Sequence, residues 1–425
     1  MLPWSPSYVA CDNNISSKTD NDRAIRNPMT GNSQFALRWV TVVATLLVSS
    51  SIFYSGVIKH GGAKDIDARY FFAAAKCWAS GVSPYEPETF RRVYQSQFAE
   101  APNAAFVAYL PTLMAVVLPM APFNWPVAAK IFSLMNFVAA MVLFWACYRL
   151  LRELLGCQLA LRHWLWVVVA ASMGAVAGTI FTGQTSVFVS AACALALLGC
   201  RLHRPWMIVI GIVIASAKPH LSGPLLIYIA LTERNSRVPI IIGVAGCLLF
   251  CGYAAIVDSN VVNNYLSSIA EYGALSVNDP AAQVGLAPIL LGIGLSPTSV
   301  SIIGAASLAI VMGLAAWALW KSKQSLSSNL RVAMLLLFSV GLAHSIQGYD
   351  LCIFATGIAL LAAVDLSMSF ALLIPALALW RPEQIARLHP AIPANLIASV
   401  AALALLVASI VLVFRQLPGR GSKTS

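Results

Sequence analysis

The sequence is short of charged residues. Asp, Glu, Lys and Arg make up 10% of its 425 residues, against roughly 25% in a typical soluble domain. So little charge excludes a soluble globular enzyme, a disordered chain and a disulfide-rich secreted scaffold. Hydrophobic residues make up 59% of the chain and the mean hydropathy is +0.78. These values predict an all-α membrane protein with several spanning helices, because only lipid tolerates this composition.

Several chemical motifs are also missing. The nine cysteines form no CxxC pair, and no Cys/His cluster has the spacing of a zinc site. No Walker A sequence is present, and no GxGxxG is followed by an acidic partner. We therefore expect no cofactor and no metal, although Asp65 and Asp67 form an Asp-x-Asp pattern that is able to bind a divalent cation. The net charge of +11 is attributed to cytoplasmic loops of a membrane protein, not to nucleic-acid binding.

Apolar runs long enough to cross a bilayer, about 20 residues each, recur along the chain. Residues 202–232 are predicted to form a hairpin with its tip at Lys218-Pro219-His220, because proline breaks a helix there. Residues 350–380 are interpreted as two short helices. The two helices of the hairpin and these two short helices are counted as four spans, which brings the predicted total to 12. The other eight spans lie at 37–58, 124–148, 163–181, 185–200, 237–257, 298–320, 330–347 and 391–414.

Residues 105–122 are apolar but contain three prolines, and charge decides how they are placed. If this segment stays on the outer face, 17 of the 27 Lys and Arg residues fall on the cytoplasmic side and 10 of the 16 acidic residues fall outside. The positive-inside rule favours that arrangement, with both termini in the cytoplasm. The predicted organisation is a cytoplasmic arm (1–36), one transmembrane domain (37–414) with an outer loop (59–123), and a cytoplasmic tail (415–425).

This topology places the unusual polar residues on one side of the membrane. The outer face receives the loop 59–104, Gly183-Gln184, Lys218, the loop 258–284 and the segment 344–350. Ionisable groups at a membrane are costly, so they are functional candidates. Residues 67–80 are predicted to form a helix lying in the interface, ended by Gly81.

At these residues the sequence resembles glycosyltransferase family 87, membrane mannosyltransferases with a GT-C fold that use polyprenyl-phosphate-mannose. The resemblance covers roughly residues 37–350. Two departures are Leu110, where the family has proline, and Ser186, where it has asparagine. The matching positions are Asp67, Gly81, Pro84, Tyr85, Tyr109, Pro111, Pro119, Gly183, Gln184, Lys218 and Pro219, with a looser match at His344, Tyr349 and Asp350.

The resemblance implies an inverting hexosyltransferase of the bacterial inner membrane. It would move a sugar, with mannose expected, from a polyprenyl-phosphate donor to a glycolipid or glycan acceptor on the outer face. Asp67 is the expected base for the acceptor hydroxyl. The expected donor-phosphate ligands are Lys218, His344 and Arg69, and the expected sugar or acceptor ligands are Gln184, Tyr85, Tyr109 and Asp350.

Plainer roles stay open for several of these residues. Asp67 is able to pair with Lys64 or Arg69 in a solvated loop, and Lys218 to snorkel to the interface. Asp350 suits the N-terminus of the following helix, where carboxylates are favoured.

Two other functions also stay open for the whole protein. A lipid-linked-glycan transporter or flippase would predict inverted repeats, which the sequence does not show. A glycan polymerase or ligase would predict a large arginine-rich outer loop, but residues 258–284 contain no Lys or Arg.

Overall fold

The computed structural model describes residues 66–102, 107–155, 161–321, 326–342, 346–361, 366–388 and 391–415, with isolated positions at 39, 43, 46–47, 50 and 53–54. The arm 1–36, most of the predicted span 37–58 and most of the tail lie outside these ranges. Every regular element in the described ranges is a helix, and one isolated pair of bridging residues joins Val284 to Ile346. The chain is thus all-α where it is described.

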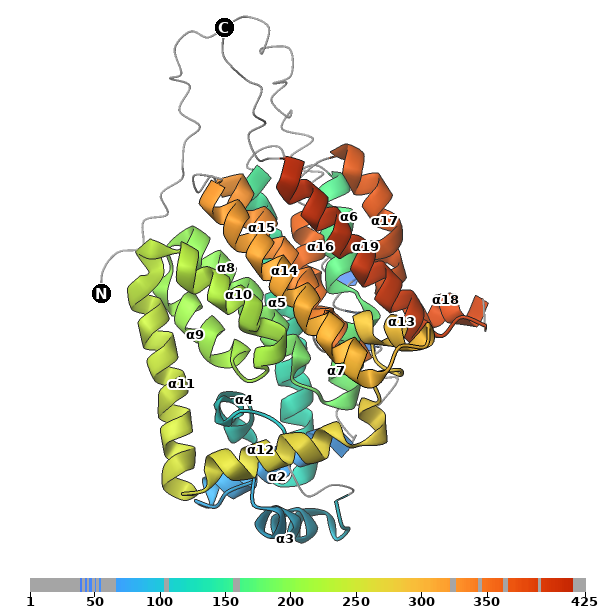
Figure 1. Cartoon of the computed structure of the whole chain (residues 1–425). Coiled ribbons are helices and arrows are strands. Elements are labelled where there is room, and N and C mark those ends of the chain that lie inside the picture. Colours follow the sequence, from blue (N-terminus) through green and yellow to red (C-terminus); the bar gives the residue numbers. More distant parts are fainter. Residues whose placement is uncertain are drawn as a thin grey trace, which may run out of the picture.

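The helices form a bundle with a smaller layer across one end (Figure 1). The bundle consists of α5 (Trp125–Leu155), α6 (Leu161–Ala171), α7 (Gly174–Thr182), α8 (Ser186–Leu202), α9 (Pro205–Ala215), α10 (Pro219–Thr232), α11 (Arg237–Val257), α14 (Pro297–Lys321), α15 (Leu326–Phe338), α16 (Phe354–Leu361), α17 (Leu366–Trp380) and α19 (Ala394–Arg415). The end layer, called the cap below, consists of α2 (Ile66–Ala79), α3 (Pro87–Phe98), α4 (Met114–Val117) and α12 (Val261–Gly273). Two short helices, α13 (Leu286–Gly292) and α18 (Pro382–Leu388), lie beside α19.

Four described helices are long and apolar enough to cross a membrane: α5, α11, α14 and α19. The other bundle helices are shorter. Each predicted span inside the described ranges contains helix, but the total of 12 spans stays a prediction. The predicted span 163–181 needs correction, because it is two helices that break at Ser172 and Met173. The indole Nε1 of Trp380 donates to the backbone oxygen of Ser172 over 2.8 Å, which satisfies a carbonyl freed by the break.

The segment 105–122 forms a short helical element rather than a spanning one. It consists of two 3₁₀ turns, Pro111–Leu113 and Leu118–Met120, on either side of α4. At about 1.5 Å per residue in the α-helix and 2.0 Å in the 3₁₀ turns, these ten residues cover about 18 Å, well short of the roughly 30 Å hydrocarbon core. This is the geometry expected of an element that stays at one membrane face.

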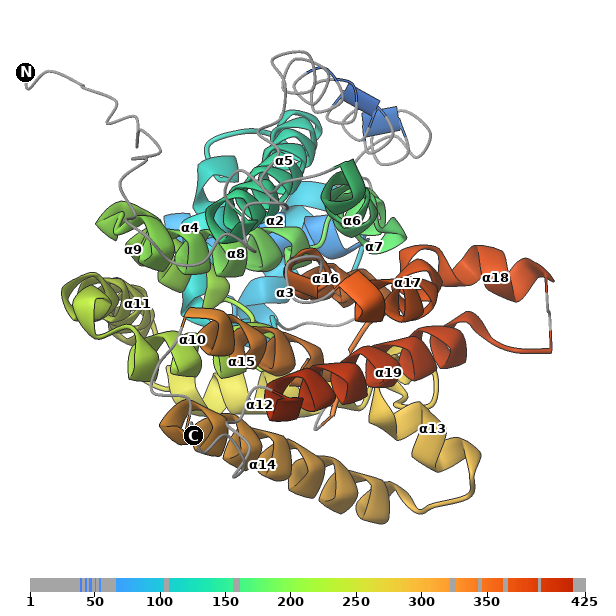
Figure 2. The same ribbon diagram turned by 90° about the horizontal axis from the view of Figure 1, so that it is seen from above.

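The core of the bundle is α8. All residues from Ser186 to Cys200 are buried, and α8 packs against α5 and α9 (Figure 2). The approach of α9 is close because Gly211 has no side chain, and a Cβ there would lie 2.7 Å from the carbonyl oxygen of Ala192. Small residues at a helix contact are typical of membrane bundles. By contrast α11 and α14 lie at the edge of the bundle (Figure 2).

Helix α2 forms where the sequence predicts it and ends at Ala79, and Gly81 just beyond it has a φ of +68°, which favours glycine. Its environment differs from the prediction of an interfacial helix. The apolar side chains of Phe71, Phe72 and Trp78 are buried, because α3, α4 and α5 pack around α2. The apolar face of this helix therefore contacts protein rather than lipid.

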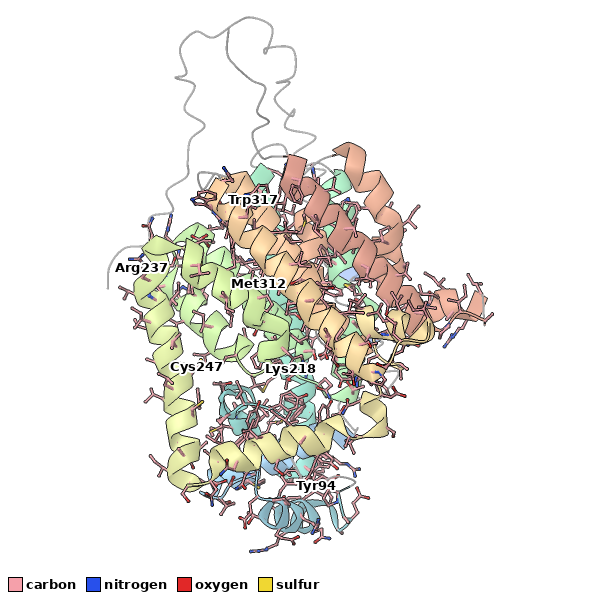
Figure 3. All side chains as sticks on the ribbon, in the orientation of Figure 1. Tyr94, Lys218, Arg237, Cys247, Met312 and Trp317 are labelled. Atoms are coloured by element: carbon pink, nitrogen blue, oxygen red, sulfur yellow. The ribbon has the colours of Figure 1, made fainter. Side chains whose placement is uncertain are left out.

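The predicted hairpin at residues 202–232 is confirmed. Helix α9 ends at Ala215, and α10 begins at Pro219 with Lys218 as its N-cap residue. Proline suits the first turn of a helix because its missing N–H has no intrahelical partner there. Figure 3 shows Lys218 between the end of the bundle that carries Arg237 and Trp317 and the cap that carries Tyr94.

Candidate functional site

Lys218 is the centre of a buried polar cluster where the bundle meets the cap. Its side chain is 3% exposed and its Nζ donates to Asp350 Oδ1 over 2.8 Å and to Ser186 Oγ over 2.7 Å. A longer contact of 3.4 Å joins Nζ to Gln184 Oε1. The three protons of the ammonium group therefore have three acceptors, and Lys218 does not snorkel to an aqueous surface.

Asp350 balances the charge of Lys218. Its Oδ1 also accepts a hydrogen bond from the Ser186 hydroxyl, and its Oδ2 accepts one from the backbone N–H of Gln347 over 3.3 Å. Gln347 precedes the 3₁₀ helix Gly348–Ile353, and the two residues form a capping box. Asp350 thus has the helix-capping role left open by the sequence and is also the counter-ion of Lys218.

Tyrosine rings enclose the ammonium group. Lys218 Nζ lies 5.4 Å from the centroid of the Tyr109 ring and 5.1 Å from that of Tyr349, within the range of cation–π attraction. The Tyr109 hydroxyl donates to Gln184 Oε1 over 2.8 Å. In turn the Tyr85 hydroxyl donates to the backbone oxygen of Tyr109 over 2.6 Å. A chain of hydrogen bonds therefore connects the cap to the N-terminus of α8.

Asp67 lies in the first turn of α2 and is partly exposed. Burial raises the pKa of Tyr109 well above its ordinary value, and the nearby Tyr272, Asp67 and Asp350 raise it further. Burial also raises the pKa of Tyr272 on α12, where the charge of Lys218 opposes the shift and those of Asp350 and Asp67 add to it. Asp67 is thus within electrostatic reach of both tyrosines, at the exposed edge of the cluster.

Arg69, an expected phosphate ligand, has partners outside this cluster. The guanidinium of Arg69 forms an ion pair with Glu100 and lies 5.2 Å from the centroid of the Phe98 ring, so it ties α2 to the end of α3. His344 lies outside the described residues, as does Asp65 of the Asp-x-Asp pattern. Within the described ranges, no group of three His, Cys, Asp or Glu side chains is placed to bind a metal ion.

Three residues of the cluster had weak signals in the sequence. Ser186 stood out only as a departure from a family asparagine, yet its hydroxyl contacts both Lys218 and Asp350. Tyr349 belonged to a loose match, and Tyr272 was one of several polar residues in an outer loop. The predicted topology is the signal that points to them, since Tyr349 and Tyr272 lie on segments assigned to the outer face and Ser186 lies at the start of the predicted span directly after Gln184.

Comparison with known proteins gives one match. The family model for glycosyltransferase family 87 matches residues 106–346, more than half of the chain. The match includes Tyr109, Gln184 and Lys218, whereas Asp67 precedes it and Asp350 follows it. No curated protein and no solved structure matched the chain, so the GT-C fold stays a prediction.

Proposed function

The chain belongs to glycosyltransferase family 87, and we propose that it is an inverting hexosyltransferase of the bacterial inner membrane. The proposed reaction moves mannose from a polyprenyl-phosphate donor to a glycolipid or glycan acceptor at the outer face. One observation carries the proposal: a carboxylate, a buried lysine and several tyrosines gather at one end of an apolar helical bundle.

The proposed base is the Asp67 carboxylate. It takes the proton of the acceptor hydroxyl while that oxygen attacks the anomeric carbon of the sugar. The bond between this carbon and the phosphate oxygen breaks, and its electron pair leaves with the polyprenyl phosphate. A single displacement of this kind inverts the anomeric centre. The partial exposure of Asp67 lets an acceptor reach its carboxylate.

The proposed phosphate site is next to Lys218. Its contact with Gln184, at 3.4 Å, is the longest of its three polar contacts, so it is the one that a phosphate oxygen would replace. The positive charge would then stabilise the departing phosphate. His344 is proposed as a further ligand, and Arg69 would have to exchange Glu100 for the phosphate to take part.

Gln184 is proposed to bind the sugar. Its Oε1 accepts from the Tyr109 hydroxyl and faces Lys218, so its Nε2 is turned away from the lysine and is available to a sugar hydroxyl. Tyr109 and Tyr85 hold this arrangement through their hydroxyl groups. Asp350 would contribute by holding Lys218, because its oxygens accept from Lys218, Ser186 and Gln347.

The choice of donor tests this proposal. The purified full chain in phosphatidylcholine nanodiscs should transfer mannose from polyprenyl-phosphate-mannose and not from a nucleotide-linked mannose. Nuclear magnetic resonance of the product should show inversion at the anomeric carbon. Transfer from the nucleotide sugar alone, or retention of configuration, would contradict the proposed donor or mechanism.

The same assay in sealed liposomes separates the competing functions. A flippase would move the labelled lipid across the bilayer without forming a glycosidic bond, and membership in a glycosyltransferase family argues against it. A polymerase would extend the acceptor by many sugars. We expect a product heavier than the acceptor by one hexose, which mass spectrometry detects directly.

A further inference from the structure

Helix α12 has three distinct faces at about 100° per residue. One face, with Tyr265, Ser268 and Tyr272, turns toward the protein, and the Tyr265 ring packs on Tyr85 with centroids 5.6 Å apart. A second face is apolar yet exposed, with Val262 65%, Leu266 57% and Ile269 40% exposed. The third face is exposed and polar, with Asn263, Ser267 and Glu271.

The apolar face of α12 follows in sequence on α11, whose apolar side chains are also exposed. Helix α11 is long and apolar enough to cross a membrane, and its Leu249 and Ile256 are 76% and 85% exposed. It ends at Val257, and α12 begins four residues later at Val261. Helix α12 then runs across the end of the bundle instead of along it (Figure 1). A helix with protein, apolar and polar faces in this order suits a boundary between lipid and water.

We propose that α12 lies in the surface of the bilayer beside the Lys218 cluster, with Val262, Leu266 and Ile269 among the acyl chains. This apolar face contacts the bilayer and not another protein. Because Tyr265 and Tyr272 are on the adjoining, protein-facing side of the same helix, α12 holds the cluster at the level of the lipid headgroups, where a lipid-bound phosphate lies.

Polar contacts join the start of α12 to the preceding turn and the segment after α12 to the Lys218 cluster. At its start, Asp258 accepts hydrogen bonds from the backbone N–H of Asn260 over 2.8 Å and from Asn264 Nδ2 over 2.9 Å. Beyond its end, Asn278 Oδ1 accepts from Gln347 Nε2 over 2.9 Å, and Gln347 is the capping partner of Asp350. Gln347 therefore connects the segment after α12 to Asp350 of the buried ion pair.

The chemistry of the attachment is apolar rather than electrostatic. Residues 258–296 contain no Lys or Arg, so this surface has no cation to attract anionic headgroups. Basic amphipathic helices gain affinity from anionic lipids, whereas this one should not. The attachment should therefore be equally strong on zwitterionic and anionic membranes.

Thiol accessibility tests the placement without any donor or activity, so its outcome is independent of the proposed reaction. The full chain carrying Leu266→Cys, and separately Ser267→Cys as the matched control one position along the helix, is placed in phosphatidylcholine nanodiscs. A water-soluble maleimide is added, and modification is read on the α12 peptide by mass spectrometry, so that the native cysteines do not interfere. After denaturation in dodecyl sulfate both sites should react equally.

We expect the cysteine at 266 to react about tenfold or more slowly than that at 267, since acyl chains exclude the reagent. Adding anionic phosphatidylglycerol should leave the ratio unchanged. Equal rates at both positions in nanodiscs would overturn the proposal by showing that the apolar face is in water. Protection of both positions would also overturn it, because another protein surface would then cover the helix. A ratio that depends on anionic lipid would refute the apolar mode of attachment.

Discussion

The ion pair between Lys218 and Asp350 makes a quantitative prediction. At the observed 2.8 Å, two unit charges attract by about 6 kcal/mol at an effective dielectric constant near 20. Desolvation of both buried ions offsets much of this gain, so the intact pair has a small net value. Removal of one partner leaves the other buried and unpaired, which costs about 3–5 kcal/mol. Asp350→Asn and Lys218→Met should each destabilise the protein by that amount.

The double variant Lys218→Met/Asp350→Asn measures the coupling energy between the two residues apart from their contacts with other groups. It removes both charges, so its loss of stability should be at least about 2 kcal/mol smaller than the sum of the single losses. Unfolding of the purified protein by dodecyl sulfate, followed by circular dichroism, measures the three values. The exposed pair of Arg91 and Glu88 is the control, with a coupling of about 0–1 kcal/mol. Additive losses at Lys218 and Asp350, within about 0.5 kcal/mol, would refute the buried pair.

Three further predictions follow from particular contacts. Tyr109→Phe removes the donor that orients Gln184 and should lower kcat/KM about tenfold, since a hydrogen bond is worth roughly 1 kcal/mol or more; unchanged kinetics would argue against that role. Gly211→Val should lower the stability of the protein by about 1–3 kcal/mol, because the new side chain would meet the α8 backbone. The control Gly252→Ala, which has open space around it, should lower stability by less than about 1 kcal/mol. Equal unfolding midpoints for the two variants would contradict the packing of α9 on α8. A deletion strain should contain an envelope glycolipid lighter by one hexose, and an unchanged glycolipid profile by mass spectrometry would count against the proposed acceptor class.

Much of the fold was predictable because it follows from local pattern. Long apolar runs located the bundle helices, and Pro219 marked the hairpin tip because proline cannot continue a hydrogen-bonded helix. The sorting of basic residues placed Gln184, Lys218 and Asp350 on one face, and the structure brings these three together. Their location at one membrane face was therefore predictable from charge, whereas their contact was not.

Other features depend on tertiary contacts that no local pattern contains. Lys218 and Asp350 are 132 positions apart, so the sequence identified each as a candidate without identifying the pair. At the break, the backbone oxygen of Ser172 accepts a hydrogen bond from Trp380, a partner 208 positions away. Helix α2 has the amphipathic pattern of an interfacial helix, but the pattern does not say whether lipid or α3 and α5 cover its apolar face.

The most direct test of the central claim is the transfer rate of three purified proteins in nanodiscs with polyprenyl-phosphate-mannose. These are the natural protein, Asp67→Asn, and the control Glu88→Gln, which changes an exposed carboxylate on α3. We predict that Asp67→Asn lowers kcat by about 10²–10⁴, the usual contribution of a positioned general base, while Glu88→Gln retains the natural rate. Full activity of Asp67→Asn would contradict the assignment of this carboxylate as the base, and no transfer by the natural protein would contradict the proposed donor.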